Sequence, residues 1–176
     1  MTLRETIARN WQRFTDAAGI TSNAVQPAPA PKPGSARLKV RGRLTLYIDG
    51  SQVASHSNLV VDTGLDAIWD CFMGDTAKVI THMCAGTGTT APAAGDTALQ
   101  AQTFTKALTS MNIAATGNMY VTFDIIPGEA TGTTFTEFGL KCQDTTTLVA
   151  RWVDGAGYLK TAGNTISGTW DLYLVP

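Results

Sequence analysis

Alternating apolar and polar positions run through most of the chain after residue 37. The segment Arg43-Leu-Thr-Leu-Tyr-Ile48 places Leu44, Leu46 and Ile48 on one face, which is the pattern of a half-buried strand. Asp49-Gly50 follows at once and predicts a tight hairpin turn. Seven or eight strands are expected in all, from the segments 43–48, 52–61, 78–85, 104–114, 119–126, 134–142, 147–153 and 165–175.

Turn residues separate these segments and indicate the fold class. They are Gly117-Asn118, Pro127-Gly128, Asp144, Asp154-Gly155 and Gly163-Asn164. Many short strands divided by turns predict a mainly β domain, namely an antiparallel β-sandwich of Greek-key or jelly-roll type. Sparse charge and abundant Thr, Ala and Gly agree with this expectation.

One short helix is expected after residue 61. Asp62 or Thr63 would cap it and Gly74 would end it. The predicted buried face is formed by Leu65, Ile68, Trp69 and Phe72.

Three tryptophans, Trp69, Trp152 and Trp170, lie in apolar-patterned segments, which favours the core over stacking on sugars.

The stretch 85–99, Ala-Gly-Thr-Gly-Thr-Thr-Ala-Pro-Ala-Ala-Gly-Asp-Thr-Ala-Leu, has no bulky apolar residue before Leu99. It follows an apolar run and precedes an alternating one, so it predicts a shaped crossing loop near a subunit contact, without an active site. The alternative is a slack surface loop.

The first 36 residues have a different pattern. Residues 1–19 predict an amphipathic helix, with a capping box from Thr2 to Glu5 and an apolar stripe. Residues 20–36 are rich in Pro and Ala and predict a semi-rigid spacer; residues 37–176 form the β domain. The helix is expected to dock on a partner through Leu3, Arg4, Ile7, Arg9, Trp11, Arg13 and Phe14.

Charge also divides the chain, at residue 43. Residues 1–43 carry eight Lys or Arg against two acidic residues, a net +6, and residues 44–176 carry five against twelve, a net −7. A basic segment before an acidic body can bind nucleic acid or an acidic protein surface, including the body of a neighbouring copy. Basic residues are not clustered and only Trp11 and Phe14 are aromatic in this segment, which favours protein.

Candidate chemistry is sparse. Cys71, Cys84 and Cys142 are too scattered for a disulfide framework and are interpreted as small buried apolar residues. Asp62, Asp66 and Asp70 recur every four residues, but such carboxylates usually face solvent, and no metal or cofactor is expected.

The two histidines do not indicate an enzyme either. His56 and His82 lie on separate predicted strands without a Ser or Cys nucleophile motif, so no catalytic site is expected. A P-loop would need a lysine that the Gly-Thr-Gly-Thr-Thr stretch lacks. The chain has no membrane-length apolar run and no signal-like N-terminus, so the protein is expected to be made and kept in a cytosol.

Three motifs resemble a broad family of structural proteins from tailed bacteriophages. They are Asn58-Leu-Val-Val-Asp-Thr-Gly-Leu-Asp-Ala-Ile68, the stretch from His82 to Leu99, and Phe135-Thr-Glu-Phe-Gly-Leu140. The resemblance covers residues 38–175, and the loop is its most specific part; the N-terminal helix and spacer lie outside it. It implies a β-sandwich subunit of a virion, without fixing its place on the particle.

The sequence therefore predicts a non-enzymatic virion protein, made in the cytoplasm of a host bacterium. The resemblance and the small size favour an accessory subunit of the tail, collar or baseplate, held by its N-terminal segment to other virion proteins. The alternative is a capsid cement or decoration protein. We expect a homo-oligomer, in particular a trimer, with no nucleic-acid or membrane partner.

Overall fold

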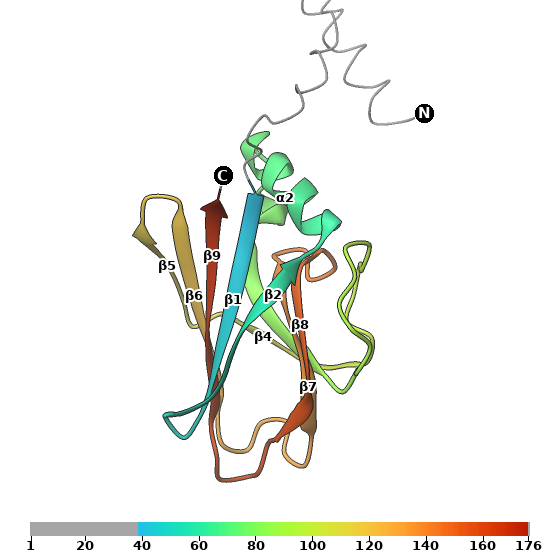
Figure 1. Cartoon of the computed structure of the whole chain (residues 1–176), viewed down its shortest axis with the longest axis vertical. Helices are drawn as coiled ribbons and strands as arrows, with labels where there is room; N and C mark the ends of the chain where they lie inside the picture. Colours follow the sequence, from blue (N-terminus) through green and yellow to red (C-terminus); the bar gives the residue numbers. More distant parts are fainter. Residues whose placement is uncertain (1–38, 176) are drawn as a thin grey trace, which may run out of the picture. The chain divides into compact units, whose positions relative to one another are not determined.

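The computed structural model describes residues 39–175; the predicted N-terminal helix and the spacer lie outside this range, and the predicted domain boundaries stay predictions. Nine strands make up most of the described part (Figure 1). They are β1 (Lys39–Ile48), β2 (Ser51–Val60), β3 (Ile80–Gly86), β4 (Gln102–Ala107), β5 (Ser110–Ala115), β6 (Asn118–Ile125), β7 (Thr134–Cys142), β8 (Leu148–Leu159) and β9 (Ile166–Val175). The helix α2 (Asp62–Phe72) and a 3-10 turn, η1 (Thr76–Lys78), lie between β2 and β3. The predicted mainly β fold with one inserted helix is confirmed.

All nine strands belong to one antiparallel sheet, in the order β4-β3-β7-β8-β2-β1-β9-β6-β5. β2 joins the two halves: it pairs with β1 along most of its length but with β8 only through Leu59–Arg151 and Val60–Ala150. Away from these two pairs β2 and β8 diverge, and the sheet curls (Figure 1).

The core lies between the two halves of the curled sheet. Phe123 on β6 stacks against Phe138 on β7 with ring centroids 6.1 Å apart, although four strands separate β6 from β7 in the sheet order. Trp152 and Trp170 are buried as predicted, and the indole N–H of Trp170 donates to Oδ1 of Asn58 at 2.8 Å.

The two edges of the sheet are consecutive in the chain. Only Leu108 and Thr109 separate β4 from β5. The Leu108 N–H still donates to the carbonyl of Thr81 on β3, whereas the Thr109 N–H donates to the carbonyl of Thr122 on β6. The predicted single strand 104–114 is therefore wrong: the chain changes halves of the sheet at this corner.

β8 is longer than predicted. The segment 147–153 was expected to end at the Asp154-Gly155 turn, but β8 continues to Leu159. Gly157 adopts a positive φ of 69° and the pairing with β7 shifts register between Phe135 and Glu137. A local irregularity of this kind bends a strand without ending it.

The first hairpin confirms its sequence signal. Asp49 (φ 49°) and Gly50 (φ 79°) both adopt positive φ, as a type I′ turn requires, and they join β1 to β2.

Helix α2 packs differently from its prediction. Val61 occupies the N-cap position without a side-chain cap, so Asp62 and Thr63 do not cap the helix; the Thr63 hydroxyl instead donates to the Leu148 carbonyl at 2.7 Å. Gly64 and Ala67 are the buried residues, and a Cβ on Gly64 would lie 2.2 Å from the carbonyl oxygen of Val149. The helix thus approaches β8 through its smallest side chains.

The predicted buried face of α2 is largely exposed. The side chains of Trp69 and Phe72 are 65% and 77% exposed, and Leu65 is 38% exposed. Trp69 is therefore not a core residue. Of the four predicted residues, only Ile68 is partly buried.

Candidate functional site

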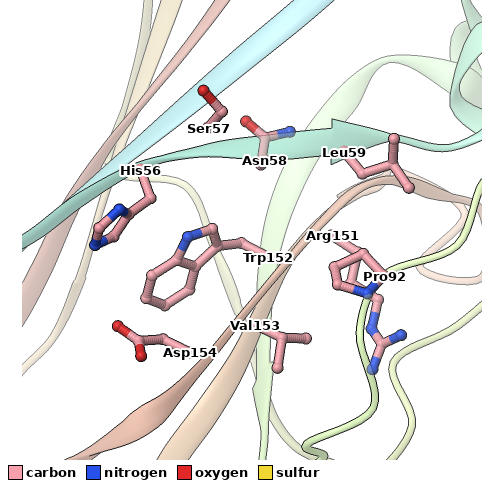
Figure 2. Close-up of a pocket in the computed structure, with 9 residues that line it drawn as sticks. All are labelled: His56, Ser57, Asn58, Leu59, Pro92, Arg151, Trp152, Val153 and Asp154. Atoms are coloured by element: carbon pink, nitrogen blue, oxygen red, sulfur yellow. The ribbon is translucent and has the colours of Figure 1, made fainter.

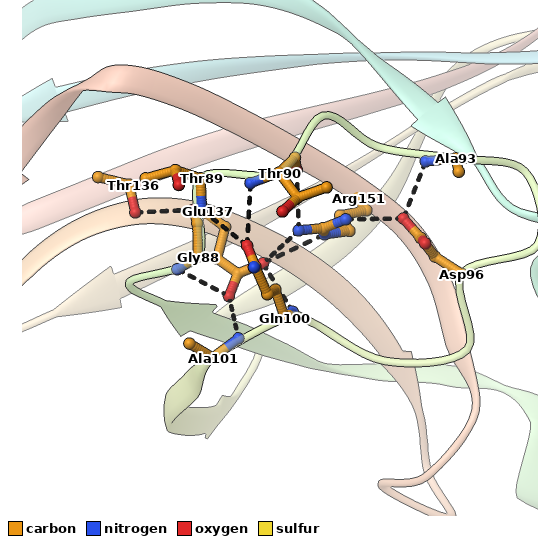
Figure 3. A network of polar contacts seen from close by, with 10 residues as sticks. All are labelled: Gly88, Thr89, Thr90, Ala93, Asp96, Gln100, Ala101, Thr136, Glu137 and Arg151. Carbon is orange, nitrogen blue, oxygen red and sulfur yellow. Dashed lines mark hydrogen bonds and ion pairs between the residues drawn. The ribbon is translucent and has the colours of Figure 1, made fainter.

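The loop 87–101 lies on the outer side of the sheet and is held by a buried carboxylate. Glu137 on β7 is fully buried. Its oxygens accept hydrogen bonds from three loop amides, those of Gly88 (3.0 Å), Gln100 (3.0 Å) and Ala101 (2.6 Å) (Figure 3). The side chain thus joins both ends of the loop to one strand.

Arg151 on β8 completes this anchor. Its Nε and Nη2 donate to Glu137 at 3.1 and 2.8 Å, its Nη1 donates to Asp96 at 2.7 Å, and its Nη2 also reaches the carbonyl of Thr90 at 3.1 Å. Burial opposes the charge on Arg151, but the hydrogen bonds to Asp96 and Glu137 raise its pKa overall. The N–H of Ala93 and the Arg151 guanidinium hold the pKa of Asp96 below its ordinary value.

Two further polar side chains define the path of the loop. Oε1 of Gln100 accepts the N–H groups of both Thr89 and Thr90 at 2.9 Å, which bridges the two arms of the loop. The hydroxyl of Thr136 donates to the carbonyl of Gly88 at 2.8 Å. The backbone groups in this part of the loop are therefore satisfied from β7 and from the loop itself.

Two glycines, one at the end of β3 and one in the loop, allow this close approach. A Cβ on Gly88 would lie 2.5 Å from Oε1 of Glu137, and one on Gly86 would lie 2.3 Å from the carbonyl oxygen of Ala101. Neither position has room for a side chain unless the anchor moves.

An apolar contact holds the far end of the loop. Leu99 is 6% exposed and packs with Val61, Cys84 and Leu148 in a small cluster separate from the main core. β7 is consequently covered on both faces, by the core on one side and by the loop on the other.

The loop is a shaped crossing loop, as predicted, and not a slack one; its place near a subunit contact stays a prediction. Sequence reasoning did not single out Glu137, Arg151 or Asp96. A signal was present, because Glu137 and Asp96 each lie within a motif of the phage resemblance.

Glu137 is a poor candidate for a catalytic base. Its two oxygens together accept five hydrogen bonds, three from amides and two from Arg151. A carboxylate saturated in this way and buried has no free lone pair directed at a substrate, so its role is structural.

A groove of about 520 Å³ with both polar and apolar walls lies beside the anchor, where β2 and β8 diverge (Figure 2). His56 on β2 stacks on Trp152 of β8 with ring centroids 6.2 Å apart. The hydroxyl of Tyr158 donates to Asp154 at 2.5 Å, which lowers the pKa of Asp154. Trp152 is only 3% exposed, so it offers little ring surface to a sugar.

The histidines and cysteines are not brought together as a site. His56 lies on β2, while His82 on β3 contacts Thr81 through Nδ1 at 2.8 Å. Cys84 and Cys142 are buried, as expected, and burial raises the pKa of each thiol to about 12; Cys71 is only partly buried. Within residues 39–175, no group of three or more His, Cys, Asp or Glu side chains could hold a metal ion.

An apolar cleft of about 500 Å³ opens at the end of the sheet near α2. Its walls come from α2, the start of β1, the hairpin β5–β6 and the end of β9, and they include Ile68, Phe72, Ile113, Met119 and Leu174. A second apolar cavity beneath α2 shares Ile68 and Phe72 with it. Ile113 is 82% exposed and Leu174 is 47% exposed, so the cleft presents apolar surface to solvent. We refer to it below as the α2 cleft.

The predicted docking residues between Leu3 and Phe14 lie outside the described residues. In the part that the structure describes, no helix is long and apolar enough to cross a membrane.

No protein-family model, curated protein or solved structure matches this chain.

Proposed function

We propose that this chain is a non-enzymatic structural protein of a tailed-phage virion, an accessory subunit of the tail, collar or baseplate attached through its N-terminal segment. The observation that carries the proposal is the contact between two motifs of the phage resemblance. The loop motif and the Thr136-Glu137-Phe138-Gly139 motif meet through the carboxylate of Glu137. Their residues serve to hold a loop on a sheet, which a structural subunit requires.

We also propose a more specific fold class than a curled sheet. We interpret the two facing halves, with the core between them, as a β-sandwich of the Greek-key or jelly-roll class whose sheets remain joined through β2. The buried aromatic contact between β6 and β7 supports this interpretation.

The N-terminal segment supplies the attachment in this proposal. Its apolar stripe would be costly to leave in water, at roughly 25 cal/mol per Å² of apolar area. Its proline-rich spacer would hold it away from the β domain to which it is joined.

The experiment is incorporation into particles. Virions are produced with the full chain or with a variant lacking residues 1–36, and the purified particles are analysed on a quantitative protein gel. We expect the full chain in the particles and the shortened chain in the lysate only. Absence of the full chain from virions would contradict the proposal, and normal incorporation of the shortened chain would contradict attachment through the N-terminal segment.

The same gel tests the location. Tail, collar and baseplate follow the low-order symmetry of the tail, so on the order of six to a few dozen copies per particle are expected. Copies numbering on the order of hundreds would instead indicate capsid cement or decoration, because a head lattice repeats its sites many times.

A further inference from the structure

The α2 cleft is an apolar surface that the described residues leave uncovered. Phe72, Ile113 and Leu174 contribute to its walls and are 77%, 82% and 47% exposed. Trp69 lies next to Phe72, with ring centroids 5.9 Å apart, and is 65% exposed. Contiguous exposed apolar patches of this kind mark interaction sites.

The same helix carries a row of carboxylates. Asp62, Asp66 and Asp70 follow each other at four-residue spacing, so they share one face of α2, adjacent to the stripe that contains Trp69. Within residues 39–175 none of the three forms an ion pair, and the stretch from Asp62 to Ala77 contains no Lys or Arg. An occupant that extended from the cleft across Trp69 would therefore also meet negative charge.

We propose that the α2 cleft binds the N-terminal segment, residues 1–19, of a second copy of this chain. That segment has the complementary chemistry, because Leu3, Ile7, Trp11 and Phe14 recur at helical spacing. Three arginines, Arg4, Arg9 and Arg13, are interspersed with them. An amphipathic helix laid into a groove is a recurring mode of peptide recognition.

A second copy is the occupant because of where the segment joins the body. β1 begins at Lys39, and Val40 already lines the cleft. The spacer from Gln26 to Gly34 carries alternating prolines and would span about 28 Å at 3.1 Å per residue. A stiff spacer longer than the gap it must bridge lowers the effective concentration of the segment at its own cleft. It favours the cleft of a neighbour.

Such a contact is heterologous, since one copy offers its N-terminal segment and the next offers its cleft. Repeating it closes a ring when the rotation between copies allows. The expected trimer is one such ring.

The test uses the full-length chain in sedimentation equilibrium. Trp11→Ala removes the largest side chain of the segment, and Ile113→Asp places a charge on the wall of the cleft. Each is expected to weaken self-association by at least about 30-fold, the effect of losing a central interface residue. Val53→Asp is the matched control, because Val53 is an exposed strand residue (43%) that does not line the cleft, and it should leave self-association unchanged.

Mixing the two variants distinguishes a neighbour's cleft from the chain's own. The Trp11→Ala variant keeps an intact cleft, and the Ile113→Asp variant keeps an intact N-terminal segment. An equimolar mixture should therefore form heterodimers, whereas each variant alone is monomeric. Docking within one chain predicts a monomeric full-length protein and no complementation. If Ile113→Asp fails to fold, Phe72→Ala on α2 replaces it, since that side chain is mostly exposed.

The inference rests on one part of the proposed function, that residues 1–36 are a docking segment, and the outcomes separate the two. A full-length chain that stays monomeric at the highest concentration reached overturns the inference, as does self-association that both variants leave intact. Neither result affects incorporation into virions. Loss of incorporation on deleting residues 1–36, with self-association unchanged, would support the proposed function and overturn this inference.

Discussion

At the scale of single residues, Glu137 decides whether the loop 87–101 can lie on the sheet. Glu137→Gln keeps the shape of the side chain but removes the charge opposite Arg151 and turns an N–H donor toward groups that are themselves donors. Breaking a buried ion pair on one side typically costs about 3 kcal/mol or more. We expect a loss of about 3 kcal/mol in the free energy of unfolding, measured by urea denaturation.

A surface ion pair provides the matched comparison. Glu129 pairs with Lys106 at 2.8 Å, but the two side chains are 31% and 27% exposed. Glu129→Gln should cost less than about 1 kcal/mol because solvent screens the pair. Equal losses for the two variants would contradict the role assigned to Glu137.

Gly88 makes a second prediction about the same anchor. A Cβ there would lie 2.5 Å from Oε1 of Glu137, whereas one on Gly95 in the same loop would contact nothing within 4 Å. Gly88→Ala should therefore lower the free energy of unfolding by roughly 1–3 kcal/mol, as overpacking does. Gly95→Ala should leave it unchanged or raise it slightly, since Ala restricts the unfolded chain. Thermal unfolding of both variants checks this; a similar loss at Gly95 would mean that the loop tolerates no side chain anywhere.

There is a physical reason why the sequence did not show that these residues form an anchor. Glu137 and Arg151 are 14 residues apart, and Asp96 is 55 residues from Arg151. A charged residue on a strand usually faces solvent, and only the fold shows that the outer face of β7 is covered. Gly88 is needed because a side chain there would collide with Glu137, and this close approach is visible only in the fold.

At the scale of the elements, the turn between β7 and β8 depends on Asp144. Its carboxylate accepts hydrogen bonds from the N–H groups of Thr146 and Thr147, from the hydroxyl of Thr147 and from Nζ of Lys78 at 2.8 Å. Burial opposes the charge, but the hydrogen bond from Lys78 and those from the threonines lower the pKa of Asp144 well below its ordinary value. The folded state therefore favours the ionised carboxylate.

The sign of the pH dependence follows from this direction. A lowered folded-state pKa contributes stability that is present above the unfolded value of about 3.9 and is lost as the pH falls below it. Asp144→Asn should cost about 1 kcal/mol at pH 7, after allowing for solvent near the turn. The difference between the two proteins should shrink below about pH 4. Urea denaturation at pH 7 and below about pH 4 measures the difference in the free energy of unfolding between the two proteins. A difference that stayed constant would exclude titration of Asp144 as its cause.

The elements themselves could largely be predicted from alternation. The strand 134–142 coincides with β7, and the hairpin at Asp49-Gly50 is confirmed. Alternation failed where it carries no information: it does not say which half of the sheet a strand joins, so the corner at Leu108 was missed. For α2, apolar periodicity favoured the face with Trp69, whereas close packing against β8 required the face with Gly64.

At the scale of the whole molecule, charge is distributed unevenly along the chain, with the basic part extending from the N-terminal segment into the start of β1. Residues 1–43 carry a net +6 and residues 44–176 a net −7. If copies associate through a basic segment and the acidic face of α2, their attraction is between exposed charges. Such attraction weakens as salt shortens the Debye length from about 14 Å at 0.05 M to about 4 Å at 0.5 M.

Self-association should therefore weaken as salt rises over this range, and the acidic row on α2 should carry much of the effect. The double variant Asp66→Asn, Asp70→Asn should associate more weakly at low salt and show a shallower salt dependence. Asp171→Asn removes one charge on β9 from a residue that does not line the cleft, and its self-association should keep the salt dependence of the parent protein. Sedimentation equilibrium at several salt concentrations measures all three proteins. If self-association of the parent and of the α2 double variant depended equally on salt, the electrostatic contact would lie elsewhere on the acidic body, because the basic segment is the same in both.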